Sequence, residues 1–326
     1  MYAPKLAPGD EIRVIAPATS MIILKEAQVE LAVERMTNLG FKVTFGKNAD
    51  AHDEFFSSSI EERIEDLHEA FADPNVKGIL TAIGGYNSNQ LLKYIDFNLI
   101  AANPKVFCGY SDITALQLAI YKKTGLVTYS GPHFSSFGVK HGLEYTLNSF
   151  LEAVTNDAPF DITPSDTWSD DAWYLDQENR TFHKQSGYMV IQEGEASGKL
   201  IGGNLCTMNL LQGTEFMPSL KDSILFIEDD EESHSRSFDR DLQSLLHLPE
   251  AASIKALLIG RFQENSNVTE EALRKIISAK EELNHIPVIA NVNFGHVQPI
   301  ATLPIGSFAT IKASGNETEI FIEQEE

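Results

Sequence analysis

The sequence predicts an α/β protein made of two domains, the first with a mostly parallel sheet. Short runs of β-branched residues alternate with segments of helical periodicity, which is typical of βαβ units. The chain has 326 residues, which is longer than one hydrophobic core usually supports. The alternation breaks between residues 156 and 187 and then resumes. We therefore predict domains at 1–156 and 188–326, joined by a segment at 157–187.

Recognisable start and stop signals divide the N-terminal domain into elements. Gly40 ends the first helix, Ser57 to Ser59 offer N-caps to the second, and Glu61 and Glu62 stand in its first turn. The pattern predicts strands at 11–17, 41–45, 76–83, 106–108 and 127–130, and helices at 24–39, 58–72, 87–95 and 112–123.

The joining segment has no sustained period and is rich in Asp, Ser, Thr and Pro. It carries both tryptophans of the chain, Trp168 and Trp173. A loop this long inside a compact protein is usually functional or disordered. Two tryptophans argue against disorder, because large aromatic side chains are costly to leave in water. We therefore interpret 157–187 as a substrate loop.

The C-terminal domain returns to regular patterning. A buried strand at 223–227 runs into the acidic stretch from Glu228 to Glu232, and a strand at 287–291 leads to Gly295 and His296. The turn Ser314-Gly315-Asn316 predicts a hairpin. The remaining pattern predicts strands at 188–192, 198–201, 255–260, 308–312 and 317–323, and helices at 237–247 and 269–283.

Composition narrows the classes of partner. The chain has 25 Lys and Arg against 47 Asp and Glu, a net charge of -22, so nucleic acids and anionic membranes would be repelled. One local pocket can still bind a nucleotide-like small molecule. No stretch approaches the roughly 18 apolar residues of a membrane helix, and the N-terminus lacks a signal-peptide pattern. Two cysteines, Cys108 and Cys206, lie in no metal or redox spacing, so we expect a cytoplasmic protein.

Candidate catalytic residues stand where predicted strands end. In open α/β sheets, functional side chains gather beyond the carboxyl ends of the strands. Gly84-Gly85, Ser111, Glu228 and His296 all take such positions. Around Ser111 the sequence Gly-Tyr-Ser-Asp-Ile keeps the first glycine of a G-x-S-x-G nucleophile corner but lacks the second. A helix N-cap explains this local pattern equally well.

The order of the chemistry-bearing residues favours a serine nucleophile. Such a serine needs a base, and the base needs an orienting carboxylate. Ser111, Glu228 and His296 supply the three groups, and His133 is the main competitor as the base. The acidic run 228–232 could instead bind a hard cation, but no HExxH motif accompanies it. No G-x-G-x-x-G or P-loop motif supports a dinucleotide or NTP site.

Five ordered motifs resemble a known family. They are IGGYNSNQLL (83–92), FCGYSDITAL (107–116), LIGGNL (200–205), ILFIEDDEE (224–232) and NFGHVQP (293–299). Together they resemble the LD-carboxypeptidase family of serine peptidases, and within it the microcin C immunity peptidase branch. The resemblance covers nearly the whole chain. It implies a flavodoxin-like or amidotransferase-like N-terminal domain, a smaller β-rich C-terminal domain, a homodimer, and no metal or organic cofactor.

The resemblance also implies roles for individual residues. Ser111 would be the nucleophile, His296 the general base and Glu228 its orienting partner. The backbone amides of Gly85 and Asp112 would form the oxyanion hole. Two further positions would contact substrate: Gly84 beside the oxyanion hole, and Asn204 near the substrate's amino and carboxyl groups.

The two branches of the family differ in substrate. LD-carboxypeptidases remove a D-amino acid from a murein tetrapeptide, whereas the immunity peptidases cleave the amide-type bond of aminoacyl nucleotides and aminoacyl sulfamoyl adenylates. The immunity branch stacks the nucleobase on a tryptophan of its loop. Stacking is worth roughly 1–3 kcal/mol per base. Trp173 is the favoured stacking residue, and Trp168 could equally pack the loop onto its own domain. The aminoacyl-nucleotide substrate is therefore our first prediction and the murein peptide the alternative.

Overall fold

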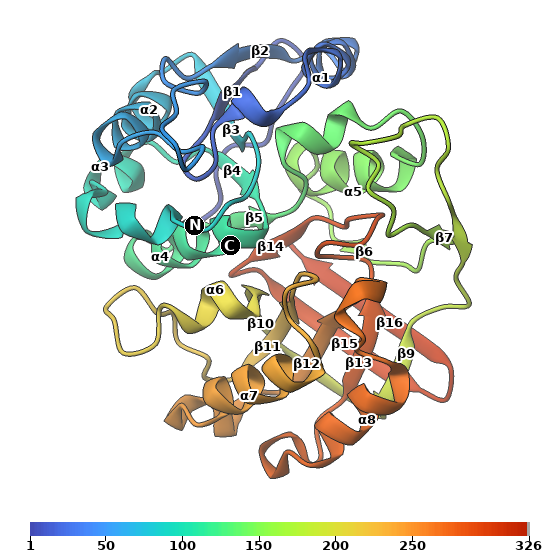
Figure 1. Cartoon of the computed structure of the whole chain (residues 1–326). Helices are drawn as coiled ribbons and strands as arrows, with labels where there is room; N and C mark the ends of the chain where they lie inside the picture. The colour runs from blue at the N-terminus through green and yellow to red at the C-terminus, as the bar shows by residue number, and fades with distance from the viewer. Residues whose placement is uncertain (325–326) are drawn as a thin grey trace.

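The computed structural model describes residues 1–324 and contains two large sheets with helices around them (Figure 1). The first sheet has six strands and the second has eight. This arrangement confirms the predicted α/β class with a parallel N-terminal sheet. Among the described residues, no helix combines the length and the apolar character needed to cross a bilayer.

The first sheet has the order β14-β5-β4-β3-β1-β2. Its first five strands along the chain are parallel, and the sixth, from the C-terminal part of the chain, pairs antiparallel with β5. The strands are β1 (Glu11–Ile15), β2 (Lys42–Phe45), β3 (Val76–Thr81), β4 (Val106–Gly109), β5 (Thr128–Ser130) and β14 (Leu303–Ile305).

Five α-helices accompany this sheet (Figure 1). They are α1 (Glu26–Asn38), α2 (Ile60–Ala72), α3 (Phe97–Ala102), α4 (Thr114–Thr124) and α5 (Glu144–Thr155). The expected cap of α2 is present, because the Ser59 hydroxyl accepts a hydrogen bond from the Glu62 amide and the Glu62 carboxylate accepts one from the Ser59 amide. This reciprocal capping satisfies two amides of the first turn.

The second sheet has the order β6-β16-β15-β10-β11-β12-β13-β9. Its central strands, β10 to β13, are parallel, and the outer strands are antiparallel. The strands are β6 (Phe160–Asp161), β9 (Met189–Gln192), β10 (Gly194–Asn204), β11 (Ser223–Glu228), β12 (Ala256–Gly260), β13 (Val288–Val292), β15 (Phe308–Ser314) and β16 (Glu317–Glu323). Its helices are α6 (Leu205–Asn209), α7 (Ser235–Leu246) and α8 (Glu270–Ser278).

The loop at 157–187 is ordered by a few specific contacts. Two-residue strands, β7 (Thr167–Trp168) and β8 (His183–Lys184), pair with each other. The Arg180 guanidinium donates to Asp171 at 2.6 Å and to the side chain of Gln298 at 2.8 Å, which ties the loop to the C-terminal segment. A largely buried arginine held in this way fixes the loop near the ends of the sheets.

Some elements differ from the prediction, and contacts between residues distant in sequence accompany these differences. The segment predicted as a helix at 87–95 is a 3-10 helix, η2 (Ser88–Tyr94), whose first amide donates to the Asp112 carboxylate at 2.8 Å. The helix predicted at 269–283 ends at Ser278, and the buried Lys280 then turns inward to bind Asp239 of α7. The sequence pattern did not predict α3, α5, α6 or β14.

Candidate active site

Ser111 occupies a strained corner between β4 and α4. Its φ is +60°, in the left-handed region that non-glycine residues seldom adopt, and a short 3-10 turn, η3 (Ser111–Ile113), leads from it into α4. Such conformations cost of order 1–3 kcal/mol and occur mainly at functional sites. A Cβ on Gly84 would lie 3.1 Å from the Ser111 Oγ, so this glycine gives the hydroxyl its space. The corner geometry fits a nucleophile better than a plain helix cap.

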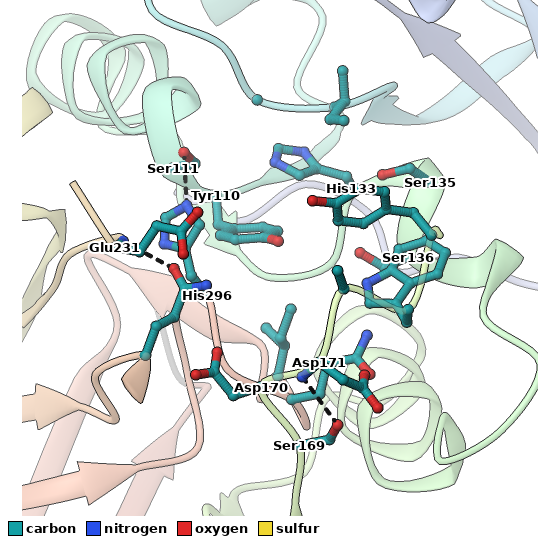
Figure 2. A pocket seen from close by; sticks show the side chains of 18 of the residues that line it. Tyr110, Ser111, His133, Ser135, Ser136, Ser169, Asp170, Asp171, Glu231 and His296 are labelled. Carbon is teal, nitrogen blue, oxygen red and sulfur yellow. Dashed lines mark hydrogen bonds between the residues drawn. The ribbon is translucent and has the colours of Figure 1, made fainter. Parts of the chain in front are cut away.

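The structure brings Ser111, His296 and Glu228 together, and Figure 2 shows the contact between Ser111 and His296. The His296 Nε2 lies 3.0 Å from the Ser111 Oγ, and its Nδ1 lies 2.7 Å from the Glu228 Oε2. Glu228 ends β11, and His296 follows β13 after Gly295. Gly295 has a φ of +97°, and a Cβ there would lie 2.7 Å from the Glu228 Oε2, so only glycine leaves room for this carboxylate.

The charges around His296 suit a general base. Because an ionised carboxylate only accepts, the His296 Nδ1–H donates to Glu228, and the Nε2 lone pair faces the Ser111 hydroxyl. Burial works against protonation of His296, but the nearby Glu228 carboxylate outweighs it and raises the pKa of the imidazole. A pair of this kind would stabilise the imidazolium that forms if the serine gave up its proton.

The two residues expected to supply oxyanion-hole amides both border Ser111. Asp112 follows Ser111 directly, and its side chain and carbonyl accept from the amide and hydroxyl of Ser88 at 2.8 Å and 2.7 Å. These contacts hold the Asp112 peptide in place at the start of the helix. Gly85 lies against Thr19, where a Cβ would be 2.7 Å from the threonine Oγ1, so a side chain at this position would disturb the corner.

Two cavities meet at Ser111. The larger has a volume of about 520 Å³ and is lined by Trp173, His133 and Ser136, among others. The smaller, of about 330 Å³, is lined by Asn204, Asp229 and further acidic side chains. Ser111 and Gly85 line both. A substrate held at the serine could therefore extend in two directions.

The two tryptophans have different environments. Trp173 lines the larger cavity together with Ser111. Trp168 instead stacks on His183, with ring centroids 4.5 Å apart, and lies under the guanidinium of Arg261 at 4.7 Å. It lines a separate cavity that does not include the serine. The structure thus brings Trp173 to Ser111 and keeps Trp168 within the packing of the loop.

Asn204 lies on the other side of Ser111 from Trp173. It ends β10 and caps α6, since its Oδ1 accepts from the Thr207 amide at 3.0 Å. Its Nδ2 donates to the Asp229 Oδ1 at 3.3 Å. Asp229 is 2% exposed, and burial together with the charge of Glu228 raises its pKa to about 7. The sequence pattern did not indicate a role for Asp229, because the acidic run that contains it is typical of an exposed surface.

The acidic run is divided between different partners. Glu228 binds His296, Asp229 binds Asn204, and the Glu231 amide donates to Gln263. In residues 1–324, no group of three or more His, Cys, Asp or Glu side chains has the geometry of a metal site. His133, the competing base, does not bind Ser111 and instead contacts the Thr81 hydroxyl.

Comparison with known protein families gives two matches that together cover most of the chain. Residues 12–131 match the LD-carboxypeptidase N-terminal domain, and residues 197–311 match the LD-carboxypeptidase C-terminal domain. The carboxypeptidase-like protein YocD of Bacillus subtilis (strain 168) is 57% identical, over 99% of this chain and 100% of that protein.

Other relatives represent both substrate branches. The microcin C7 self-immunity protein MccF of Escherichia coli is 33% identical, over 94% of this chain and 91% of that protein. The murein tetrapeptide carboxypeptidase of Pseudomonas aeruginosa is 26% identical, over 93% of each chain.

Solved structures give the same result. An MccF-like protein from Bacillus anthracis superimposes with a TM-score of 0.97 at 56% identity, covering 99% of each chain. MccF in complex with aspartyl sulfamoyl adenosine superimposes with a TM-score of 0.89 at 30% identity, covering 100% of this chain and 99% of that one. The chain described here therefore belongs to the LD-carboxypeptidase family and is a hydrolase of the carboxypeptidase type.

Proposed function

We propose that this protein is a Ser-Glu-His peptidase that hydrolyses the amide-type bond of aminoacyl nucleotides, including processed microcin C and aminoacyl sulfamoyl adenylates. Its role would be self-immunity or detoxification. The observation that carries the proposal is the chain of contacts from Ser111 through His296 to Glu228, placed where the two cavities meet. MccF, similar to this chain over its whole length, binds aspartyl sulfamoyl adenosine.

The geometry supports a two-step acyl transfer. In the first step Ser111 Oγ bonds to the scissile carbonyl carbon while His296 Nε2 takes the hydroxyl proton. The amides of Gly85 and Asp112 bind the oxyanion, and one such donor is typically worth about 100- to 1000-fold in rate. His296 then gives the proton to the departing nitrogen as the carbon–nitrogen bond breaks.

In the second step water releases the amino acid. His296 takes a proton from water as the water oxygen bonds to the acyl carbon, and it returns that proton to Ser111 as the ester bond breaks. Glu228 keeps the imidazole oriented and balances its positive charge in both steps. The chain's own side chains and amides supply every group that these steps use.

The two cavities suit the two ends of such a substrate. Trp173 in the larger cavity offers an aromatic face for the nucleobase. The acidic side chains of the smaller cavity offer acceptors for the α-ammonium group of the aminoacyl part. Asn204, whose Oδ1 already accepts from the amide and hydroxyl of Thr207, can offer its side-chain amide hydrogens to the same part of the substrate. Gly84 and Gly85 let the substrate backbone approach the serine between them.

A murein tetrapeptide is the second candidate substrate, because the Pseudomonas aeruginosa relative is a murein tetrapeptide carboxypeptidase. A side-by-side assay of the purified protein on an aspartyl sulfamoyl adenosine and on a murein tetrapeptide separates the two. We expect faster hydrolysis of the nucleotide, and no hydrolysis of either by Ser111→Ala with an unchanged melting temperature. Faster cleavage of the tetrapeptide would favour the alternative, and full activity of Ser111→Ala would refute the nucleophile.

The homodimer expected from the resemblance stays a prediction. Light scattering coupled to size-exclusion chromatography would measure the mass in solution directly against the 36.1 kDa of one chain.

A further inference from the structure

His133 is a second histidine beside the nucleophile, and the reaction described above gives it no task. It follows β5 through Gly131-Pro132 and is 2% exposed. Its Nδ1 lies 2.7 Å from the Thr81 Oγ1. Its Nε2 is buried and has no hydrogen-bond partner in residues 1–324. An unpaired polar atom in such a place is uncommon and calls for an explanation.

The unpaired nitrogen faces the same point as the nucleophile. A Cβ built on Gly84 would lie 3.1 Å from the Ser111 Oγ and 3.4 Å from the His133 Nε2. These two distances place the Oγ and the Nε2 no more than 6.5 Å apart, on either side of the space above Gly84. A carbon attacked by Ser111 would carry its substituents into that space. Figure 2 shows His133 facing the cavity from the side opposite His296.

The surroundings hold the ring of His133 in one orientation. It stacks on Tyr110 with centroids 4.3 Å apart, and the same tyrosine meets His296 edge-on at 5.2 Å. A Cβ on Gly109 would lie 2.2 Å from the Thr81 Oγ1 and 3.3 Å from the His133 Nδ1, so glycine is needed there for the threonine–histidine pair. Two glycines, a threonine and a tyrosine thus fix the imidazole next to the reaction centre.

His133 also stays uncharged. Burial, with a smaller contribution from the nearby His296, lowers its pKa to about 3. It therefore offers a neutral hydrogen bond at any working pH, and it does not compete with His296 for the serine proton. The Thr81 hydroxyl can donate to Nδ1 or accept from it, so Nε2 can serve as a donor or an acceptor.

The position of His133 identifies the part of the substrate that it would meet. It lines the larger cavity with Trp173 and does not line the smaller one. In the proposed orientation the larger cavity takes the nucleoside, so the group between the scissile carbonyl and the nucleoside passes His133. We propose that His133 Nε2 binds this sulfamoyl or phosphoryl linker directly and so selects nucleotide-linked substrates over simple acyl compounds. This inference rests on the proposed function.

Matched variants test the contact. His133→Asn keeps an amide near the Thr81 hydroxyl but has no atom at the Nε2 position, whereas His133→Gln can extend its amide to that position. We expect His133→Asn to lower kcat/KM for an aspartyl sulfamoyl adenosine roughly 5- to 50-fold, mostly through KM, because the linker is left unpaired. The loss for an aspartyl aryl ester, which has no linker, should be several-fold smaller, and His133→Gln should recover part of the activity. His52→Asn, an exposed histidine outside both cavities, is the control.

The assignment would be overturned if His133→Asn lost equal activity on the nucleotide and on the ester. It would also be overturned if His133→Gln recovered no activity although both variants melt at the wild-type temperature. Calorimetric binding of the nucleotide to Ser111→Ala, with and without His133→Asn, repeats the test without turnover and should show a similar loss of affinity. If wild-type protein neither binds nor cleaves the nucleotide, the proposed function is refuted, whatever the His133 variants do. In that case the contact of His133 with a nucleotide linker is overturned as well. If His133→Asn then loses more activity on a murein tetrapeptide than on the ester, His133 would be reassigned to binding the peptide.

Discussion

The two cavities that meet at Ser111 differ in chemistry more than in size. The larger presents aromatic rings, the neutral His133, serine hydroxyls and three carboxylates, those of Asp170, Asp171 and Glu231. The smaller is lined by Asp229, Asp230, Glu232 and Asp241, with Arg240 paired to Asp241 as its cation. The larger cavity therefore suits a flat group that can stack on its aromatic rings, and the denser carboxylates of the smaller cavity suit a cationic group. The difference indicates a direction for the substrate as well as a place for it.

The largest expected effect comes from disturbing catalysis at Ser111, which lines both cavities. Glu228→Gln keeps the shape of the side chain but takes away the charge that orients and stabilises His296. We expect kcat to fall about 1000- to 10000-fold for every substrate, as for loss of the orienting carboxylate in other serine hydrolases. Stopped assays on the nucleotide and the murein tetrapeptide should show equal proportional losses. A loss confined to one substrate would mean that Glu228 acts in one cavity and not on the histidine.

A smaller effect should distinguish the contribution of the larger cavity to substrate binding from that of the smaller one. Trp173→Ala removes the proposed stacking face, worth roughly 1–3 kcal/mol, so kcat/KM for an aminoacyl sulfamoyl adenosine should fall about 5- to 150-fold. The murein tetrapeptide, which has no base, should be affected far less. Trp168→Phe is the matched control, because Trp168 stacks on His183 away from the serine. Equal losses on both substrates would contradict stacking by Trp173.

The charge of the aminoacyl group should report on the smaller cavity. Its excess of carboxylates favours a lysyl over an aspartyl sulfamoyl adenosine, by about 5- to 20-fold in kcat/KM at low salt. Glu232→Gln should reduce this preference, and added salt should reduce it in the wild-type protein. A preference that does not change with salt would show that contact shape, and not charge, decides the choice.

The smallest effect concerns two buried groups with opposite shifts. The pKa of His133 is lowered from 6.5 to about 3, so below pH 6.5 the unfolded chain binds a proton that the folded protein refuses, and stability falls as the pH falls. The pKa of Asp229 is raised from 3.8 to about 7, so between these values the folded protein holds a proton that the unfolded chain releases, and stability falls as the pH rises.

Replacing each group should therefore change the pH dependence in opposite directions. On moving from pH 7 to pH 5, His133→Asn should lose less unfolding free energy than wild type, and Asp229→Asn should lose more, each on the order of 1–2 kcal/mol. Urea titrations at the two pH values measure both differences. Two variants that follow the wild-type protein would show that neither group is shifted as described.

The sequence predicted the parts of the molecule that depend on local pattern. Strand and helix positions followed from periodicity, and an N-cap among Ser57 to Ser59 was expected, which Ser59 supplies. The constellation of Ser111, Glu228 and His296 was suggested by strand ends and by the motifs of the family. Local pattern could not predict tertiary contacts. Examples are the space that Gly295 leaves for Glu228 and the contact of the buried Asp229 with Asn204.

The choice between the tryptophans also lay beyond the sequence. Trp168 and Trp173 are five positions apart in the same irregular segment, with no period to assign either to a face. Their separation depends on Arg261, which comes from elsewhere in the chain, and on His183, which comes from the far end of the same segment to stack on Trp168. Likewise, the helix predicted at 87–95 is a 3-10 helix, and its first amide is bound by a carboxylate that is distant in sequence. Partners of this kind are set by the fold and not by neighbouring residues.

The strand β14 has a consequence for how the enzyme is made. Residues 303–305 leave the C-terminal domain and become the edge strand of the first sheet, next to β5 at 128–130. The ribosome finishes the nucleophile corner early, yet this sheet gains its last strand only after the segment that carries His296 has been synthesised. The contact between Ser111 and His296 can therefore form only after a further 185 residues have been added to the chain beyond the serine.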